Sequence, residues 1–280
     1  MKIILVPTDF SKAARNASEY AAHFAKDVKA KILLIHAYHL PVPVSEVPVM
    51  IVSQNELQKE NEAQLKKEAA HLKKIAGVEV NYKAKMGFAV DEILEEEKNG
   101  TLIVMGMEGA SKLSEALMGS ITTSTLRKTQ APVLVIPENV KYKKPEKIVF
   151  ACDYDPRTDV HTLDALKALM KTFASKVYVV NVKNKKESVT VDEAIAGVNL
   201  ENKLCDVQHV YYFPEKKDLV EGINEFVEDK KADLVAIIPH RYNLMESLFH
   251  KSISKKMAFH THVPMLALPD NHKSIDAYFL

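Results

Sequence analysis

Three glycines and one serine in a single stretch have the types and the spacing to bind phosphate groups. Gly106 ends a short apolar run, Gly109 lies three residues later, and Gly119 and Ser120 precede a helical pattern. A glycine lacks a Cβ atom, so a ligand can approach its backbone closely. A helix N-terminus offers unpaired N–H groups and partial positive charge, and Ser120 adds a hydroxyl donor. The pattern G-x2-G-x9-G-S therefore predicts a phosphate site.

The alternative is that these glycines are ordinary turn residues. Three of the eight glycines of the chain fall within these fourteen residues, and this concentration favours the ligand site. The stretch differs from the better known phosphate loops, because it matches neither GxxxxGK[ST] nor GxGxxG.

Two residues at the ends of other predicted strands complete the candidate site. Asp9 follows the first strand, where a carboxylate can accept hydrogen bonds from ribose hydroxyls or help hold a metal ion on phosphates. The alternative for Asp9 is a local cap of the helix that follows. Ala37, at the end of the second strand, is small enough to border an adenine ring. The alternative for Ala37 is plain core packing.

The elements that must position these residues alternate between strand and helix. Short apolar runs and one alternating run predict strands at residues 3–6, 32–37, 78–84, 102–105 and 133–136. Helical patterns cover residues 11–26, 53–75 and 89–98. This alternation predicts an α/β fold with a five-stranded parallel sheet in the order 3-2-1-4-5 and helices on both faces. Such sheets bind ligands between the ends of the first and fourth strands.

The second part of the chain repeats this pattern. Strands are predicted at 147–152, 176–182, 207–213, 234–238 and 264–269, with helices ending near 173 and 227. PMLALP at 264–269 matches PVLVIP at 132–137, and the alignment has no gap back through the fourth strand. The chain is therefore predicted to form two tandem Rossmann-like domains, at residues 1–140 and 145–270, with a C-terminal tail at 271–280.

The repeat differs from the first copy where the glycines should lie. The alignment replaces them by larger residues, namely Gly106 by Ile238, Gly109 by Arg241 and Gly119 by Lys251, and keeps only the serine, as Ser252. Side chains would then fill the space where backbone should meet phosphate. We expect the second domain not to bind a nucleotide in this manner.

Composition limits the class of protein. The chain has 280 residues, with 38 basic and 37 acidic side chains, so it lacks the basic excess of a nucleic-acid binder. It contains no apolar run of about 18 residues and no signal peptide pattern, which predicts no membrane partner. Its two cysteines indicate reduced thiols and a cytoplasmic location. The acidic run Glu95–Glu97 has the spacing of a solvated helix face.

The sequence resembles the universal stress protein family. The resemblance is carried by VPTDFS at residues 6–11, by the glycine pattern and by PVLVIP, and the duplication resembles the tandem members of that family. It implies ATP binding, a five-stranded parallel α/β fold and frequent dimerisation. Transferred by position, it implies contacts to the nucleotide from Pro7, Thr8, Asp9, Ala37, Met105, Gly106, Gly109, Gly119, Ser120 and Ile121. It also favours the ligand-binding interpretation of Asp9 and Ala37.

Three functions follow from these observations. The first is an ATP-binding stress-response or regulatory protein, with the nucleotide, with or without Mg²⁺ at Asp9, in the first domain only. The second is a slow ATPase or phosphotransferase, although no constellation of catalytic base and lysine is evident. The third is a nucleotide-free scaffold for dimerisation and partner docking. The expected partners are an adenine nucleotide, the two domains paired as an intramolecular pseudo-dimer, and a second copy in a homodimer.

Overall fold

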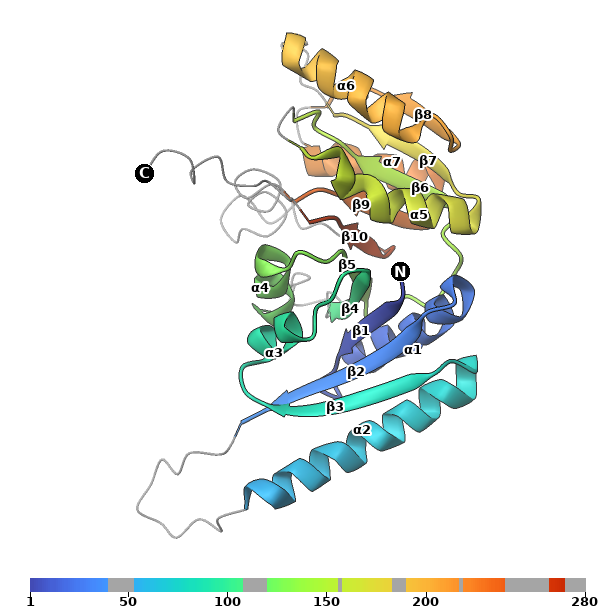
Figure 1. The fold of residues 1–280 in the computed structure, drawn as a ribbon. Coiled ribbons are helices and arrows are strands. Elements are labelled where there is room, and N and C mark those ends of the chain that lie inside the picture. Colours follow the sequence, from blue (N-terminus) through green and yellow to red (C-terminus); the bar gives the residue numbers. More distant parts are fainter. Residues whose placement is uncertain are drawn as a thin grey trace, which may run out of the picture.

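A computed structural model describes residues 1–39, 53–107, 120–155, 158–182, 190–216, 219–239 and 262–269. Strands and helices alternate through the first half of the chain (Figure 1): β1 (Ile3–Pro7), α1 (Lys12–Val28), β2 (Lys31–Tyr38), α2 (Gln54–Ala76), β3 (Val80–Met86), α3 (Ala89–Glu95), β4 (Thr101–Met107), α4 (Ser120–Lys128) and β5 (Val133–Pro137). Every strand and helix predicted for this half is therefore present.

The second half repeats the alternation with one more helix than the sequence predicted. Its elements are β6 (Lys147–Ala151), the short 3-10 helix η1 (Val160–Leu163), α5 (Asp164–Phe173), β7 (Lys176–Val180), α6 (Val191–Leu204), β8 (His209–Tyr212), α7 (Leu219–Lys230), β9 (Leu234–Ile237) and β10 (Met265–Ala267). Helix α6 escaped prediction because its apolar residues do not form one buried stripe: Val191 is 77% exposed, whereas Leu200 and Leu204 are buried.

The ten strands form one sheet in the order β3-β2-β1-β4-β5-β10-β9-β6-β7-β8. Each half thus has the predicted order 3-2-1-4-5, and its neighbouring strands are parallel. β3 lies at an end of the sheet, as its alternating sequence predicted. The fold is the predicted tandem Rossmann-like α/β arrangement, with the two five-stranded sheets joined edge to edge.

The junction between the halves is the antiparallel pair β5–β10. Val133 to Val135 lie opposite Ala267 to Met265, and all of these side chains are buried. Because every other strand pair is parallel, the antiparallel pair reverses the strand direction between the halves. The carboxyl ends of β1 and β4 therefore lie at one edge of the sheet, and those of β6 and β9 lie at the opposite edge.

Helices cover both faces of the sheet, and the two hydrophobic cores run through both halves. One core contains buried side chains of α1, α2, α5 and α6, and the other contains those of α3, α4 and α7. Ser11 caps the N-terminus of helix α1, because its hydroxyl accepts a hydrogen bond from the N–H of Ala14. The many alanines of α1 allow a close approach to the sheet. Figure 1 shows α1 and α5 on the same side of the sheet, near the junction.

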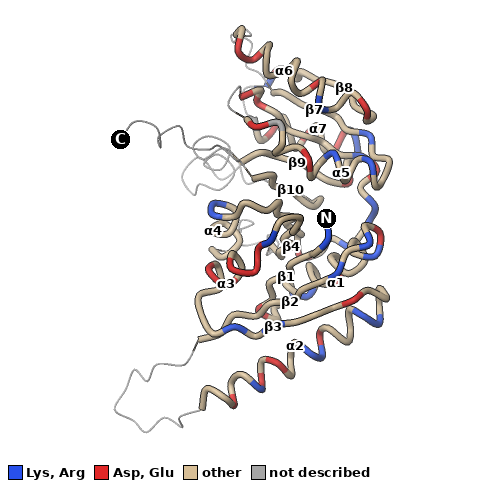
Figure 2. The backbone as a smooth tube through the Cα atoms, in the orientation of Figure 1, with Lys and Arg blue, Asp and Glu red and all other residues tan. Residues whose placement is uncertain are grey.

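The charged residues of the first half differ in burial from one helix to the next. Acidic and basic residues alternate along α2 (Figure 2), and its lysine pairs Lys66–Lys67 and Lys73–Lys74 are exposed. For the run Glu95–Glu97 the sequence also predicted a solvated face. The same prediction is wrong for Glu96 after α3, which is only 7% exposed. Both Glu96 carboxylate oxygens lie 2.7 Å from the Lys83 ammonium on β3, so this carboxylate is an internal ion-pair partner.

The connector between β5 and β6 packs on α1. The amide of Asn16 donates to the carbonyls of Pro137 and Val140, and the Tyr142 hydroxyl donates to the Asp27 carboxylate at 2.6 Å. No helix in the described part of the chain is long and apolar enough to cross a lipid bilayer. The predicted tail at 271–280 lies outside the described residues.

Candidate functional site

A pocket of about 330 Å³ opens at the carboxyl ends of β1, β2 and β4. Residues of α1, of α3 and of the start of α4 form the rest of its wall. This is the position at which the strand order of a parallel sheet reverses, where sheets of this class bind ligands. Its volume lies in the range of small-molecule sites.

The pocket gathers the predicted residues that lie in the described part of the chain. These are Pro7, Thr8, Asp9, Ala37, Met105, Gly106, Ser120 and Ile121. Gly109 and Gly119 lie outside the described residues. Sequence reasoning missed other lining residues, which are Ser11, Ala13, Ala14, Ile35, His36, Ala89, Ile93 and Thr122. His36 could have been noticed, because its imidazole interrupts the apolar run ILLIHAY.

The loop after β1 forms one end of the pocket and has a strained backbone. Phe10 has φ of +61°, a conformation that is unfavourable for an aromatic residue. Local hydrogen bonds stabilise the loop: the Thr8 hydroxyl accepts from the N–H of Phe10 at 3.1 Å, and the N–H of Thr8 donates to the carbonyl of Ile35 at 2.9 Å. Thr8 is only 5% exposed, so this end of the pocket is well ordered by its surroundings.

Asp9 has the local contact that the capping interpretation predicts. Its Oδ1 accepts a hydrogen bond from the N–H of Ser11 at 2.9 Å, immediately before α1. The side chain is exposed and lines the pocket. Because a carboxylate has two oxygens and several acceptor positions, this bond leaves capacity for a ligand or a cation.

Gly106 is required by the packing of helix α1. A Cβ atom at this position would lie 2.6 Å from the carbonyl oxygen of Ala13 and 2.7 Å from its carbon. Both atoms belong to the backbone of α1, so no side-chain rotation relieves the contact. The sequence pattern predicts this glycine for the approach of a ligand. The packing of α1 requires a glycine here whether or not a ligand binds.

The second half has a larger side chain at the position of Gly106. In the sheet register Ile238 corresponds to Gly106, and this isoleucine is 4% exposed. The segment before the first α-helix is longer in this half, since α5 begins thirteen residues after β6 ends, whereas α1 begins five residues after β1 ends. Arg241, Lys251 and Ser252, the counterparts of the other motif residues, lie outside the described residues.

The loop after β6 repeats the hydrogen bonds of the loop after β1. Tyr154, like Phe10, has positive φ (+54°), and its N–H approaches the Cys152 Sγ atom at 3.4 Å. The N–H of Asp155 donates to the Asp153 carboxylate at 3.2 Å. Burial raises the pKa of the Cys152 thiol to about 12, so this sulfur is neutral. The loop conformation therefore persists in the half that lacks the glycine motif.

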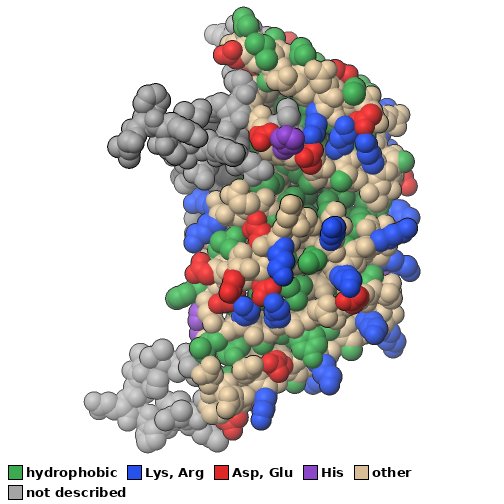
Figure 3. All heavy atoms as spheres, viewed as in Figure 1, with side chains coloured by type: hydrophobic (Ala, Val, Ile, Leu, Met, Phe, Trp, Pro, Cys, Tyr) green, Lys and Arg blue, Asp and Glu red, His purple; other side chains and the backbone are tan. Residues whose placement is uncertain are grey.

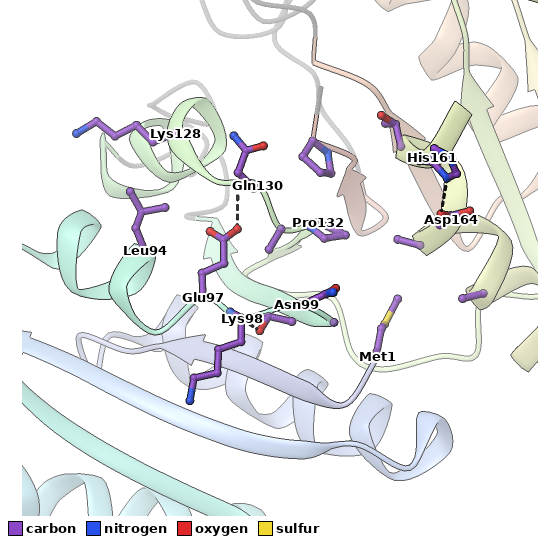
Figure 4. Close-up of a pocket in the computed structure, with 17 residues that line it drawn as sticks. Met1, Leu94, Glu97, Lys98, Asn99, Lys128, Gln130, Pro132, His161 and Asp164 are labelled. Atoms are coloured by element: carbon purple, nitrogen blue, oxygen red, sulfur yellow. Dashed lines mark hydrogen bonds and ion pairs between the residues drawn. The ribbon is translucent and has the colours of Figure 1, made fainter. Parts of the chain in front are cut away.

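A larger cavity, of about 810 Å³, lies between the halves, away from the predicted residues. Figure 3 shows hydrophobic atoms on the floor of a hollow in this region, and Figure 4 shows the residues that line the cavity. Its charged groups do not converge: Lys98 and Lys128 extend away from it, and His161 pairs with Asp164 at 3.3 Å. Glu97 accepts a hydrogen bond from the N–H of Gln130 at 3.0 Å. The charged groups among the described lining residues therefore do not gather at one point of this cavity.

Comparisons with known proteins agree with the fold. A sequence model of the universal stress protein family matches residues 1–137. The chain is 32% identical over 155 residues to universal stress protein MJ0531 of Methanocaldococcus jannaschii, which covers 52% of this chain and 84% of that protein. It is 30% identical over 154 residues to universal stress protein MJ0577 of the same organism, and this match covers 48% of this chain and 94% of that protein. The crystal structure of a universal stress protein from Archaeoglobus fulgidus has a TM-score of 0.74 at 18% identity, covering 96% of this chain and 98% of that one. The last similarity extends the shared fold over both halves.

Proposed function

Because the chain belongs to the universal stress protein family, we propose that its first half binds ATP in the pocket at the ends of β1, β2 and β4. The observation that supports this most strongly is convergence: eight residues predicted from sequence to contact a nucleotide, from four separate places in the chain, line this one pocket. In this proposal the protein is a cytoplasmic stress-response or regulatory protein. ATP acts by favouring one conformation, which requires a different affinity for each state.

The chemistry of the pocket suits the parts of a nucleotide. Ala37 and Met105 offer small and apolar contacts for the base, and Thr8 and Asp9 offer oxygen atoms for the ribose hydroxyls. Ser120 begins α4, so its hydroxyl and the first N–H groups of the helix are donors for phosphate. The phosphates would therefore lie at the start of α4.

Magnesium fits this arrangement as an ion carried by the nucleotide. Asp9 is the one carboxylate among the described lining residues, and beside a triphosphate it would be repelled without a cation. Mg²⁺ uses one or two carboxylates together with substrate phosphates, and it keeps several waters. The described residues contain no cluster of three His, Cys, Asp or Glu side chains placed for a metal, so the phosphates would supply the other ligands.

The two halves form domains with different roles in this proposal. The first domain, residues 1–140, holds the nucleotide, and the second, residues 145–270, pairs with it through β5 and β10 as an intramolecular pseudo-dimer. Ile238 at the position of Gly106, followed by Pro239 without an N–H group, argues against a second nucleotide. We expect one ATP per chain.

Calorimetric titration of the full chain with ATP and Mg²⁺ tests the proposal. Asp9→Ala should weaken binding, whereas Asp153→Ala, which removes the matching carboxylate of the second half, should leave the affinity unchanged. Both variants lose the same type of loop hydrogen bond, so their difference reports the ligand contact. Absence of binding at millimolar ATP would contradict the proposal and favour the nucleotide-free scaffold.

Phosphate release under multiple turnover distinguishes binding from hydrolysis. The described lining residues include Asp9 but no lysine or arginine, so the charge compensation and water positioning of fast phosphoryl transfer are absent from this part of the site. We therefore expect the bound ATP to remain intact over many minutes. Sustained release that Asp9→Ala abolishes would establish the ATPase instead.

A further inference from the structure

We propose that His36 is a positioning residue that fixes the Thr8–Asp9 segment in the geometry required for ligand binding. This inference rests on the proposed function, because the ligand contacts of Thr8 and Asp9 belong to that proposal. His36 acts on them through the backbone: its Nδ1 atom lies 2.7 Å from the carbonyl oxygen of Thr8. Its ring also packs against that of Phe10, with ring centroids 4.6 Å apart.

The hydrogen bond determines the tautomer of His36. A carbonyl oxygen can only accept a hydrogen bond, so Nδ1 must carry the proton and donate it to Thr8. The Nδ1–H tautomer is therefore required in the neutral imidazole. This assignment can be measured directly and does not depend on a bound nucleotide.

The loop needs such a clamp because its backbone is strained. Phe10 at φ of +61° is stable only if neighbouring contacts hold it there. The Thr8 hydroxyl and the Asp9 carboxylate form bonds within the loop itself. His36, by contrast, is a side chain of β2, and it ties the loop to the sheet.

The second half supplies independent support, since it makes the same bond with a different residue. In the sheet register Thr8 corresponds to Cys152 and His36 to Asn181. The Asn181 amide donates to the carbonyl of Cys152 at 2.8 Å, and the strained residue of that loop is Tyr154. His36 and Asn181 have different side chains, but each places a hydrogen-bond donor at this position, and each holds its copy of the loop. The donor, and not the imidazole as such, is therefore the common requirement.

The bond made by Asn181 indicates that asparagine can replace His36 without loss of its function. The amide Nδ2 of asparagine occupies a place comparable to that of the imidazole Nδ1, so His36→Asn should keep the bond to Thr8. His36→Leu has similar bulk and no donor, and it should release the loop. Asn181→Leu removes the corresponding bond in the second half and serves as the matched control.

The test measures ATP affinity of the full chain by calorimetry, with thermal unfolding of each variant recorded in parallel. His36→Leu should raise the Kd about tenfold, which is the effect of losing one half-buried hydrogen bond. His36→Asn should stay within about twofold of the unsubstituted protein, as should Asn181→Leu. Equal Kd values for His36→Leu and the unsubstituted protein would overturn the proposal, and so would a failure of His36→Asn to restore binding. Lower stability of His36→Leu with unchanged Kd would show a merely structural role.

Long-range ¹H–¹⁵N spectra of the histidine rings separate this proposal from that of ATP binding. They should show Nδ1–H for His36, and the amide signals of Thr8 to Ser11 should shift in His36→Leu but not in His36→Asn. An Nε2–H tautomer would overturn the proposal that His36 donates to the Thr8 carbonyl, whatever the affinity for ATP. If the ring and amide signals behave as expected and ATP does not bind, the nucleotide proposal alone fails and the loop geometry is retained.

Discussion

Replacement of Gly106 by alanine tests the packing argument most directly. The added Cβ would lie 2.6 Å from the Ala13 carbonyl oxygen, 2.7 Å from its carbon and 3.1 Å from the Ala14 nitrogen. These are backbone atoms of α1, so relief requires the helix to move by roughly 0.8 Å to reach ordinary van der Waals contact at 3.4 Å.

Helix α1 cannot move that far without loss of other contacts. Its inner face is buried against β1, β4 and β5, and Asn16 ties it to the connector through the carbonyls of Pro137 and Val140. Overpacking of this kind costs about 1–3 kcal/mol. In a protein of this size each kcal/mol lowers the Tm by about 2–4 °C, so we expect a fall of roughly 2–12 °C.

Gly197→Ala is the matched control. Gly197 lies inside helix α6, and a Cβ there would meet only ring atoms of Tyr154, at 3.6 and 3.7 Å. Alanine at this position should raise stability by about 0.5–1 kcal/mol, because it favours the helix more than glycine does. Thermal and urea unfolding measure both variants. A Gly106→Ala protein as stable as the unsubstituted one would refute the argument that α1 excludes a side chain here.

Three further predictions concern other contacts. Burial opposes ionisation of Glu96, but the ammonium groups of Lys83 and Lys85 outweigh this effect and lower the pKa of the Glu96 carboxyl. We therefore expect Glu96→Gln to be less stable than the unsubstituted protein at pH 7, as measured by unfolding at different pH values. Because the folded pKa is depressed, that difference should close as the pH falls below about 4, and a constant difference would contradict the ion pair. Ala37→Ile should fill part of the pocket and raise the Kd for ATP at least about tenfold, with unfolding midpoints showing stability changed by less than about 1 kcal/mol. Tyr142→Phe should cost about 0.5–1.5 kcal/mol in urea unfolding through the lost bond to Asp27, and no change would mean that the connector contributes nothing there.

The sequence allowed the strand order to be predicted because each buried strand is a compact apolar run and the second half repeats the first. It also identified eight of the residues that meet in the pocket, partly through turn glycines and strand ends and partly through the family resemblance. Helix α6 was missed because periodicity detects only a helix with one buried stripe, and Val191, Ile195 and Val198 are exposed. The burial of Glu96 depends on Lys83 from another element, which no local pattern reveals. The role of Gly106 in packing depends on the path of α1, and the bond from His36 to Thr8 depends on a sheet register.

The β5–β10 pair also has an evolutionary consequence. In a symmetric homodimer every substitution appears twice, so a change that destroys a ligand site destroys both. Here the two strands that meet belong to one chain, whose halves are joined by the short connector between β5 and β6, and their pairing does not depend on protein concentration. One half can therefore exchange a glycine for Ile238 while the other keeps Gly106. Covalent linkage has released the two copies from symmetry, and each can be selected for its own task.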